Sequence, residues 1–205
     1  MAIKTADRQI FSSYAGDLLV ETRRMQGDIE RILLDEKAIE KRVDAMALEI
    51  GRDFPDGTVL VIVLLNGAMV FAADLLRRVE LVLEVECVRA SSYHGGMDSS
   101  GVVDFGGSVF PDVRGRHVLL LDDILDTGRT LHAVSSRLEL GGAASLRRAV
   151  LLAKDKKRAV NVDVDYTGFM IGDEFVVGYG LDYRGRYRNL PYLGVLKQKV
   201  TGVEA

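Results

Sequence analysis

The stretch VLLLDDILDTGRT, residues 118–130, decides the fold. It begins with an apolar run, 118–121, which stops at two adjacent carboxylates, Asp122 and Asp123. Asp126 follows, and a small hydroxyl-rich turn then leads into a helical pattern. A run that is apolar on both faces is typical of a strand buried in a parallel sheet. The stretch therefore predicts a buried strand, a turn and a helix, with three acids at the carboxyl end of the strand.

The same order of residues predicts a ligand site. In open α/β sheets, ligands bind beyond the carboxyl ends of the strands, where acids can meet hydroxyl groups or a metal ion. A small turn before a helix offers backbone N–H groups to a phosphate. One site could thus hold a sugar by its diol and a phosphate by the backbone. The alternative is an ordinary strand-to-helix turn whose acids are exposed by chance, and the register of the acids with Thr127 and Gly128 argues against it.

The composition is that of a globular protein with one ample core. The chain has 205 residues, of which 48% are hydrophobic and 28% charged. Its net charge of −3 argues against nucleic acid as the main partner. The single cysteine, Cys87, excludes an intramolecular disulfide, and we expect a buried thiol within a strand. There is no signal-peptide pattern and every apolar run is too short to span a bilayer, so we expect a cytoplasmic protein that has no membrane partner.

Apolar runs and alternating patterns predict seven further strands. They are expected at residues 29–34, 59–65, 83–89, 145–153, 162–169, 174–178 and 192–196. Strands that alternate with helices indicate a mostly parallel central sheet flanked by helices, which is an α/β fold. The part of the chain near the C-terminus is rich in Tyr, Arg and Gly, and we expect it to form a small lobe over the edge of the sheet.

Helical stripes lie between these strands. Asp35 can cap a helix that we expect to stop at Gly51, with the apolar stripe Ile39, Val43, Met46 and Ile50. A second helix is expected through Phe71, Leu75 and Leu76, and a third through Leu131, Val134 and Leu138. The third should stop at the two glycines 141–142. Residues 10–19 approximate another helical stripe, which Gly16 weakens.

Residues 91–114 are rich in Ser, Gly and Asp and have little periodicity. Loops of this length inside compact domains are usually lids, binding loops or disordered segments. The alternative is a short hairpin around residues 102–105 and 108–110. The two interpretations are compatible, because a mobile lid can be a hairpin.

The stretch 118–130 resembles the phosphoribosyl-pyrophosphate (PRPP) signature of type I phosphoribosyltransferases, which has two acids, two apolar residues, Asp, and then Thr or Ser before Gly. Four other parts of the chain resemble, in the expected order, parts of the hypoxanthine-guanine phosphoribosyltransferase family. They are the pyrophosphate loop with its helix (64–75), the flexible catalytic loop (91–103), the strand end that carries the base-recognising lysine (151–158), and the purine-binding hood (173–183 and 186–192).

The resemblance runs from about residue 29 to about residue 196 and implies a type I phosphoribosyltransferase fold. The whole chain, 1–205, would be one domain. Its core would lie at about 35–168, and its hood would come from the N-terminal segment and about 169–205.

The resemblance implies a purine salvage reaction. The enzyme would transfer 5-phosphoribose from PRPP to N9 of a 6-oxopurine, hypoxanthine or guanine, to form inosine or guanosine monophosphate (IMP or GMP) and pyrophosphate. Mg²⁺ is the implied cofactor, and a homodimer or homotetramer is the implied assembly. The alternative is a nucleotide-sensing regulator on the same fold without a catalytic role; such proteins usually carry an added DNA-binding domain or a basic RNA-binding face, and neither is visible in the sequence. Xanthine stays open as a further substrate.

Each residue that matches the family pattern takes an implied role. Asp126 would act as acid or base at purine N7, while Ser92 and Tyr93 close over the reacting centre. The implied PRPP-binding residues are Asp122 and Asp123 at the ribose diol, Asp126, Thr127, Gly128, Arg129 and Thr130 at the 5′-phosphate, and Leu65, Asn66, Gly67 and Arg188 at pyrophosphate. The implied purine-binding residues are Lys154 at the 6-oxo group, Phe175 stacked on the ring, the Val176 backbone, and Asp182. The implied metal ligands are Asp182, Asp122 and Asp123.

Taken without the resemblance, three of these residues have ordinary interpretations. Lys154 would be a solvated lysine in a basic run, Phe175 a core aromatic, and Arg188 a surface arginine.

Two positions depart from the family pattern. Asp122 stands where the family usually has Glu, so its carboxylate is one methylene short, and we expect it to act through water or a small shift. Asn66 stands where the family usually has a lysine that bridges subunits and sits at an unusual peptide bond. Because Asn66 cannot supply a positive charge, we expect weaker binding of PRPP or pyrophosphate and no loss of activity.

Overall fold

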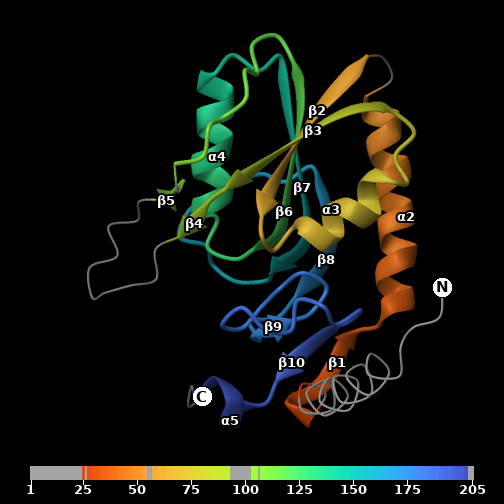
Figure 1. Ribbon diagram of the computed structural model, residues 1–205, viewed down its shortest axis with the longest axis vertical. Coiled ribbons are helices and arrows are strands. Elements are labelled where there is room, and N and C mark those ends of the chain that lie inside the picture. Colours follow the sequence, from red (N-terminus) through yellow and green to blue (C-terminus); the bar gives the residue numbers. More distant parts are fainter. Residues whose placement is uncertain (1–24, 26, 55–56, 93–102, 106, 203–205) are drawn as a thin grey trace, which may run out of the picture.

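A five-stranded sheet forms the centre of the computed structural model, which describes residues 25, 27–54, 57–92, 103–105 and 107–202 (Figure 1). All neighbouring strands in this sheet are parallel, which confirms the α/β prediction. In spatial order the strands are β3 (Val82–Arg89), β2 (Thr58–Leu65), β6 (His117–Leu125), β7 (Ser145–Lys154) and β8 (Tyr166–Ile171). The stretch quoted above is the middle strand of the sheet.

Helices cover both faces of the sheet (Figure 1). On one face lie α2 (Glu36–Asp53) and α3 (Met69–Leu76), and on the other lies α4 (Arg129–Leu140). Alternate residues of β2 divide between the two cores: Val59, Val61 and Val63 face α2 and α3, whereas Leu60, Ile62 and Leu64 face α4. The central strands are therefore buried on both faces, as their continuous apolar runs predict.

The first predicted helix begins where expected but ends later. Asp35 caps α2, because its Oδ1 accepts a hydrogen bond of 2.8 Å from the Ala38 N–H. The predicted stop at Gly51 is wrong, since the helix runs to Asp53. A glycine inside a helix costs only about 1 kcal/mol relative to alanine. Burial of Ile50 and Phe54 on either side of Gly51 offsets that cost.

The predicted small lobe is a three-stranded antiparallel sheet, which we call the hood sheet. It pairs β1 (Ile29–Leu34) with β10 (Leu193–Leu196) and β10 with β9 (Val176–Val177), and the short helix α5 (Gln198–Thr201) follows. In Figure 1 it lies below the central sheet. The division into a core at 35–168 and a hood stays a prediction, and the helical stripe at 10–19 lies outside the described residues.

Two strand predictions near the C-terminus were only partly correct. The strand predicted at 162–169 is β8 (Tyr166–Ile171), and the strand predicted at 174–178 shortens to β9 (Val176–Val177). Val162 and Val164 resemble strand residues because they are apolar and alternate, yet they pack as a loop against the core on the α4 side.

The predicted hairpin has a different partner strand. β5 (Val103–Asp104) pairs with β4 (Ser91–Ser92), and residues 108–110 form no strand. The Ser108 hydroxyl contacts the Arg89 backbone instead, at 3.1 Å from its N–H and 3.3 Å from its carbonyl. Phe110 packs under the Arg137 guanidinium, 4.2 Å from its ring centre. These contacts hold the segment against the end of β3 and against α4.

The prediction of a buried Cys87 is wrong, because its thiol is exposed. β3 is the edge strand of the central sheet, and Val88 is the one buried residue among its eight. Helices cover the central strands and leave most of this edge open. No helix in the described part of the chain combines the length and apolarity needed to cross a membrane.

Candidate functional site

Two adjoining cavities lie where the central sheet meets the hood sheet. The larger, about 470 Å³, is lined by the loop after β2, by the acids at the end of β6 and the turn that follows it, and by residues from the C-terminal part of the chain. The smaller, about 200 Å³, is lined by the ends of β6 and β7 and by residues 174–176. Both cavities share Asp123, Asp126 and Asp182. The structure thus brings most of the predicted site residues to one place.

The acidic pair forms the deep wall of the larger cavity. Asp122 is buried, and its Oδ1 accepts a hydrogen bond of 3.0 Å from the Asp123 N–H. Asp123 Oδ1 accepts one of 2.9 Å from the Ile124 N–H. Burial raises the pKa of Asp122 well above its ordinary value, and the neighbouring charge of Asp123 adds to the rise. Burial also raises the pKa of Asp123, and the hydrogen bonds with Asp122 and the Ile124 N–H, followed by the charge of Arg188, partly oppose that rise. Buried carboxylates of this kind are stabilised by a ligand that donates hydroxyl hydrogens or brings positive charge.

The turn after β6 brings the N-terminus of α4 to the wall of the cavity, with the Arg129 N–H donating to Thr127 Oγ1 at 3.5 Å. Gly128 is the N-cap of α4, and no side chain caps the helix there. The first N–H groups of a helix lack internal partners, so this end of α4 favours a phosphate. Gly128 has φ 80°, and a Cβ there would lie 2.2 Å from the Val160 carbonyl oxygen, so only glycine fits. Thr127 and Thr130 line the same cavity. Arg129 begins α4 and is not among the residues that line either cavity.

The loop after β2 is held between the acidic pair and the C-terminal part of the chain. The Leu65–Asn66 peptide bond is cis, in agreement with the unusual bond that the resemblance implied there. Gly67 packs closely against Asp123, since a Cβ at Gly67 would lie 1.6 Å from Asp123 Oδ2. On the other side, a Cβ at Gly180 would lie 2.2 Å from the Gly67 carbonyl oxygen. Asn66 is exposed and lines the larger cavity.

Arg188 and Asp182 close the larger cavity as an ion pair. Arg188 Nη2 lies 2.6 Å from Asp182 Oδ1, and Nη1 donates to the Gly180 carbonyl at 2.7 Å. Asp182 Oδ2 accepts from the Gly185 N–H at 2.6 Å. The ordinary interpretation of Arg188 as a surface arginine is therefore wrong. Its second nitrogen is anchored on the backbone, which fixes the guanidinium at the cavity wall.

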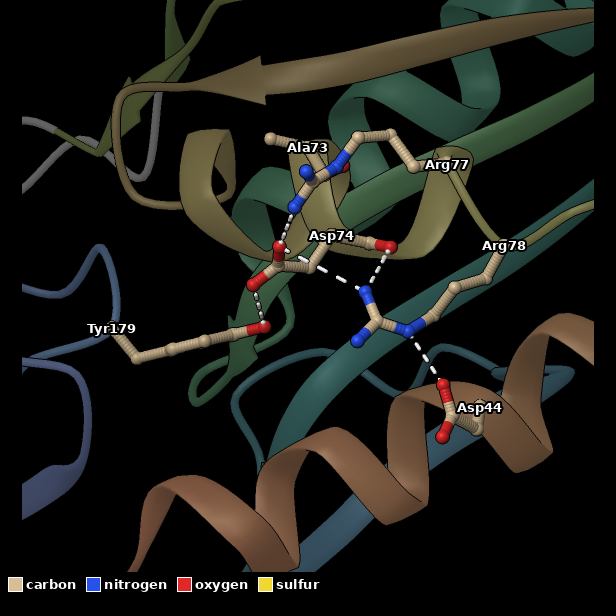
Figure 2. A network of polar contacts seen from close by, with 6 residues as sticks. All are labelled: Asp44, Ala73, Asp74, Arg77, Arg78 and Tyr179. Atoms are coloured by element: carbon tan, nitrogen blue, oxygen red, sulfur yellow. Dashed lines mark hydrogen bonds and ion pairs between the residues drawn. The ribbon is translucent and has the colours of Figure 1, made fainter.

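A polar network holds this part of the chain against the helices (Figure 2). Tyr179, which is buried, donates its hydroxyl to Asp74 Oδ2 at 2.7 Å. The Asp74 carboxylate also forms an ion pair with Arg77. The guanidinium of Arg78 donates to the backbone carbonyl of Asp74 and to the carboxylate of Asp44 on α2. Burial and the bond to Asp74 raise the pKa of Tyr179 far above its ordinary value. The network links the segment just before Gly180 to α3, which follows the Asn66 loop.

The smaller cavity has the features of a site for a flat, polar-edged ring. Lys154 is buried at the end of β7, with its Nζ 3.0 Å from Asp173 Oδ1 and 3.5 Å from Asp126 Oδ2. Phe175 is 47% exposed at the cavity wall and meets Tyr183 edge to face, with ring centres 5.5 Å apart. Val176 is buried beside it. The ordinary interpretations of a solvated Lys154 and a core Phe175 are therefore wrong.

Sequence reasoning missed several residues of the site. Tyr179 and Asp74 are 105 positions apart, and no local pattern links a buried tyrosine to a helix carboxylate. Lys156 and Asp173 were also missed. The only signal for Lys156 was its place in the basic run 154–158, which is equally typical of a solvated surface.

Ser92 and Tyr93 are the two residues predicted to close over the reacting centre. Ser92 lies in β4, and Tyr93 lies outside the described residues. Their role in closing the reacting centre stays a prediction.

Comparisons with known proteins agree on one family. Residues 31–184 match the family model of the phosphoribosyl transferase domain. The hypoxanthine-guanine phosphoribosyltransferase of Streptococcus pneumoniae R6 is 40% identical over 176 residues, which cover 86% of this chain and 98% of the relative. That of Bacillus subtilis 168 shows the same identity and coverage. A crystal structure of a hypoxanthine phosphoribosyltransferase from Staphylococcus aureus superposes with a TM-score of 0.81 at 36% identity, covering 86% of this chain and 96% of the other.

Proposed function

Because this chain belongs to the type I phosphoribosyltransferase family, we propose that it transfers 5-phosphoribose from PRPP to N9 of a 6-oxopurine. Relatives that match over almost their whole length are named hypoxanthine-guanine phosphoribosyltransferases, so hypoxanthine and guanine are the proposed bases. The products are pyrophosphate and IMP or GMP, in purine salvage. One observation carries the proposal: a cavity with an acidic pair and a helix N-terminus adjoins a cavity with a buried lysine and an exposed aromatic ring.

PRPP would occupy the larger cavity. Asp122 and Asp123 accept hydrogen bonds from the ribose 2′- and 3′-hydroxyls, which add donors to the one backbone N–H that each carboxylate already has. The N–H groups at the start of α4, with the Thr127 and Thr130 hydroxyls, hold the 5′-phosphate. The Asn66–Gly67 backbone and the anchored guanidinium of Arg188 hold the pyrophosphate, because a fork of donors suits a phosphate.

The purine would occupy the smaller cavity. Lys154 donates to the 6-oxo oxygen, Phe175 stacks on the ring, and the Val176 backbone meets the base edge. Asp126 stabilises or takes the proton at N7, which makes N9 a better nucleophile. A bond then forms between N9 and C1′ of the ribose as the bond from C1′ to the pyrophosphate oxygen breaks. Positive charge develops on the ribose during this step, so closure by Ser92 and Tyr93 would exclude water.

Mg²⁺ is proposed to enter with the pyrophosphate. Among the described residues, no three His, Cys, Asp or Glu side chains lie together as a protein-only metal site. Mg²⁺ usually takes one or two carboxylates and completes its shell with water and substrate phosphates. Asp182 and Asp123 on the wall of one cavity fit that donor set, with Asp122 behind them. When bound, the ion would neutralise charge on the leaving pyrophosphate.

We also propose a homodimer or homotetramer that works in the cytoplasm. Met69, at the start of α3 just after the Asn66 loop, is 52% exposed, and an apolar side chain there supports contact with a second copy. Sedimentation of the purified protein would check this, and a monomer at micromolar concentration would contradict it.

One parallel assay tests the function. PRPP and Mg²⁺ are combined with hypoxanthine, guanine, xanthine or adenine, and nucleotide formation is followed. We expect product from hypoxanthine, guanine or both, and none from adenine, because Lys154 needs an acceptor at position 6 and adenine presents an amino group. PRPP binding without product from any base would favour the regulatory alternative, and product from adenine alone would refute the assignment of Lys154.

Restoring a lysine at position 66 should strengthen PRPP binding. In Asn66→Lys, the new ammonium would face the pyrophosphate from the exposed loop, so we expect the KM for PRPP to fall about five- to tenfold, which corresponds to one added hydrogen bond of about 1 kcal/mol. The turnover number should change little. Asn66→Gln, which adds length without charge, is the matched control. An unchanged KM in Asn66→Lys, or an equal fall in both variants, would contradict the prediction.

A further inference from the structure

A second ammonium group lies beside the purine cavity, on Lys156. Its Nζ is 2.6 Å from Asp126 Oδ1 and 2.6 Å from Asp173 Oδ1. Lys154 Nζ contacts the same two carboxylates, at 3.5 Å and 3.0 Å. Two lysines and two aspartates thus form a closed ring of opposite charges at the edge of the cavity. Lys156 makes the shorter contact with each carboxylate.

The loop that carries Lys156 is fixed at both ends. The Asp155 N–H donates to the Ile171 carbonyl at 2.8 Å, and the Val160 N–H donates to the Thr127 carbonyl at 3.1 Å. The second bond ties this loop to the turn that holds Asp126. These bonds hold the backbone of the loop against the turn that carries Asp126.

Asp126 depends on Lys156 more than on Lys154. Oδ1 of Asp126 is a buried atom with no hydrogen bond to another described group, and its contact is the Lys156 ammonium. The contacts with Asp126 and then Asp173 raise the pKa of Lys156, so it stays a cation. Lys156 is itself only 29% exposed, which limits screening by solvent.

The proposed reaction withdraws Lys154 from this ring. Once Lys154 donates to the 6-oxo group of a base, its charge is shared with the substrate. Lys156 is then the cation left to hold both carboxylates. We propose that Lys156 is a positioning residue of the purine site: it holds the Asp126 carboxylate in place while Lys154 binds the base. The inference rests on the proposed function, since it assigns Asp126 and Lys154 the roles given above.

The test compares three variants with the wild-type enzyme. Lys156→Met keeps the apolar stem and removes the charge, and Lys156→Arg restores a cation. Lys157→Met is the matched control, because Lys157 is the exposed neighbour in the same basic run. We expect kcat with hypoxanthine to fall about tenfold in Lys156→Met, because even a displacement of a catalytic group by less than about 1 Å lowers the rate. The KM for the purine should rise, the KM for PRPP should stay within about twofold, and Lys156→Arg should recover most of kcat.

The kinetic results can overturn the positioning role of Lys156 in three ways. Unchanged or higher kcat in Lys156→Met would overturn the proposal, and so would equal losses in Lys156→Met and Lys156→Arg or a matching rise in the KM for PRPP. A crystal structure of Lys156→Met gives a readout besides activity: a displaced Asp126 carboxylate supports the proposal, and an unmoved one overturns it. If the wild-type enzyme and Lys157→Met form no nucleotide from any 6-oxopurine, the proposed function itself fails, which these comparisons distinguish.

Discussion

Replacing Asp126 with asparagine is expected to lower kcat with hypoxanthine by about 10²- to 10⁴-fold, the usual contribution of a general acid or base. The reason is chemical, because an amide of the same shape cannot take the proton at purine N7. Asp126 lies at the junction of the two cavities, within 4 Å of both lysines at the purine site. PRPP should still bind, since the proposed 5′-phosphate site consists mainly of backbone N–H groups at the start of α4.

The measurement pairs steady-state kinetics with a calorimetric titration of PRPP and Mg²⁺. Asp155→Asn is the matched control, because Asp155 is an exposed carboxylate one position beyond the end of β7. That control should have the turnover of the wild type. Undiminished turnover in Asp126→Asn would remove Asp126 from the acid–base role. Loss of PRPP binding in that variant would mean that the carboxylate also builds the phosphate site.

Adding one methyl group at Gly67 is expected to lower kcat/KM for PRPP by about 100-fold, the scale of a misplacement of about 1 Å in a reacting site. The Cβ of Gly67→Ala would lie 1.6 Å from Asp123 Oδ2, so the carboxylate must move. The loop cannot retreat, because its carbonyl lies directly against Gly180. The ribose diol and the pyrophosphate would thus lose their partners together.

Gly51→Ala is the matched control, because a Cβ at Gly51 meets nothing within 4 Å. This substitution in α2 should leave PRPP kinetics unchanged and raise the melting temperature slightly, since alanine favours helix. The melting temperature of Gly67→Ala should stay near that of the wild type, because the affected loop lines an open cavity. PRPP kinetics in Gly67→Ala that match the wild type would show that Asp123 can move without loss of function.

Local patterns were enough to predict most elements. The apolar run before Asp122 predicts the middle strand, because a strand buried on both faces needs apolar residues at every position. The stripe from Ile39 to Ile50 predicts α2, because its buried residues recur with the helical period. Patterns of this kind predict a single helix or strand, and they do not predict which other helices or strands pack beside it. They therefore failed at Cys87, where burial depends on the position of β3 at the sheet edge.

The sequence by itself determined the parallel α/β sheet and the acids at the carboxyl end of its middle strand, because the period of apolar residues and the order of the turn residues are local properties of the chain. Only the tertiary structure decided which groups meet at those acids. The contact of Gly67 with Asp123, the bond from Tyr179 to Asp74 and the approach of Lys156 to Asp126 join residues that are distant in the chain. Such contacts follow from how strands, helices and loops pack in space, and no short-range pattern of residues records that packing.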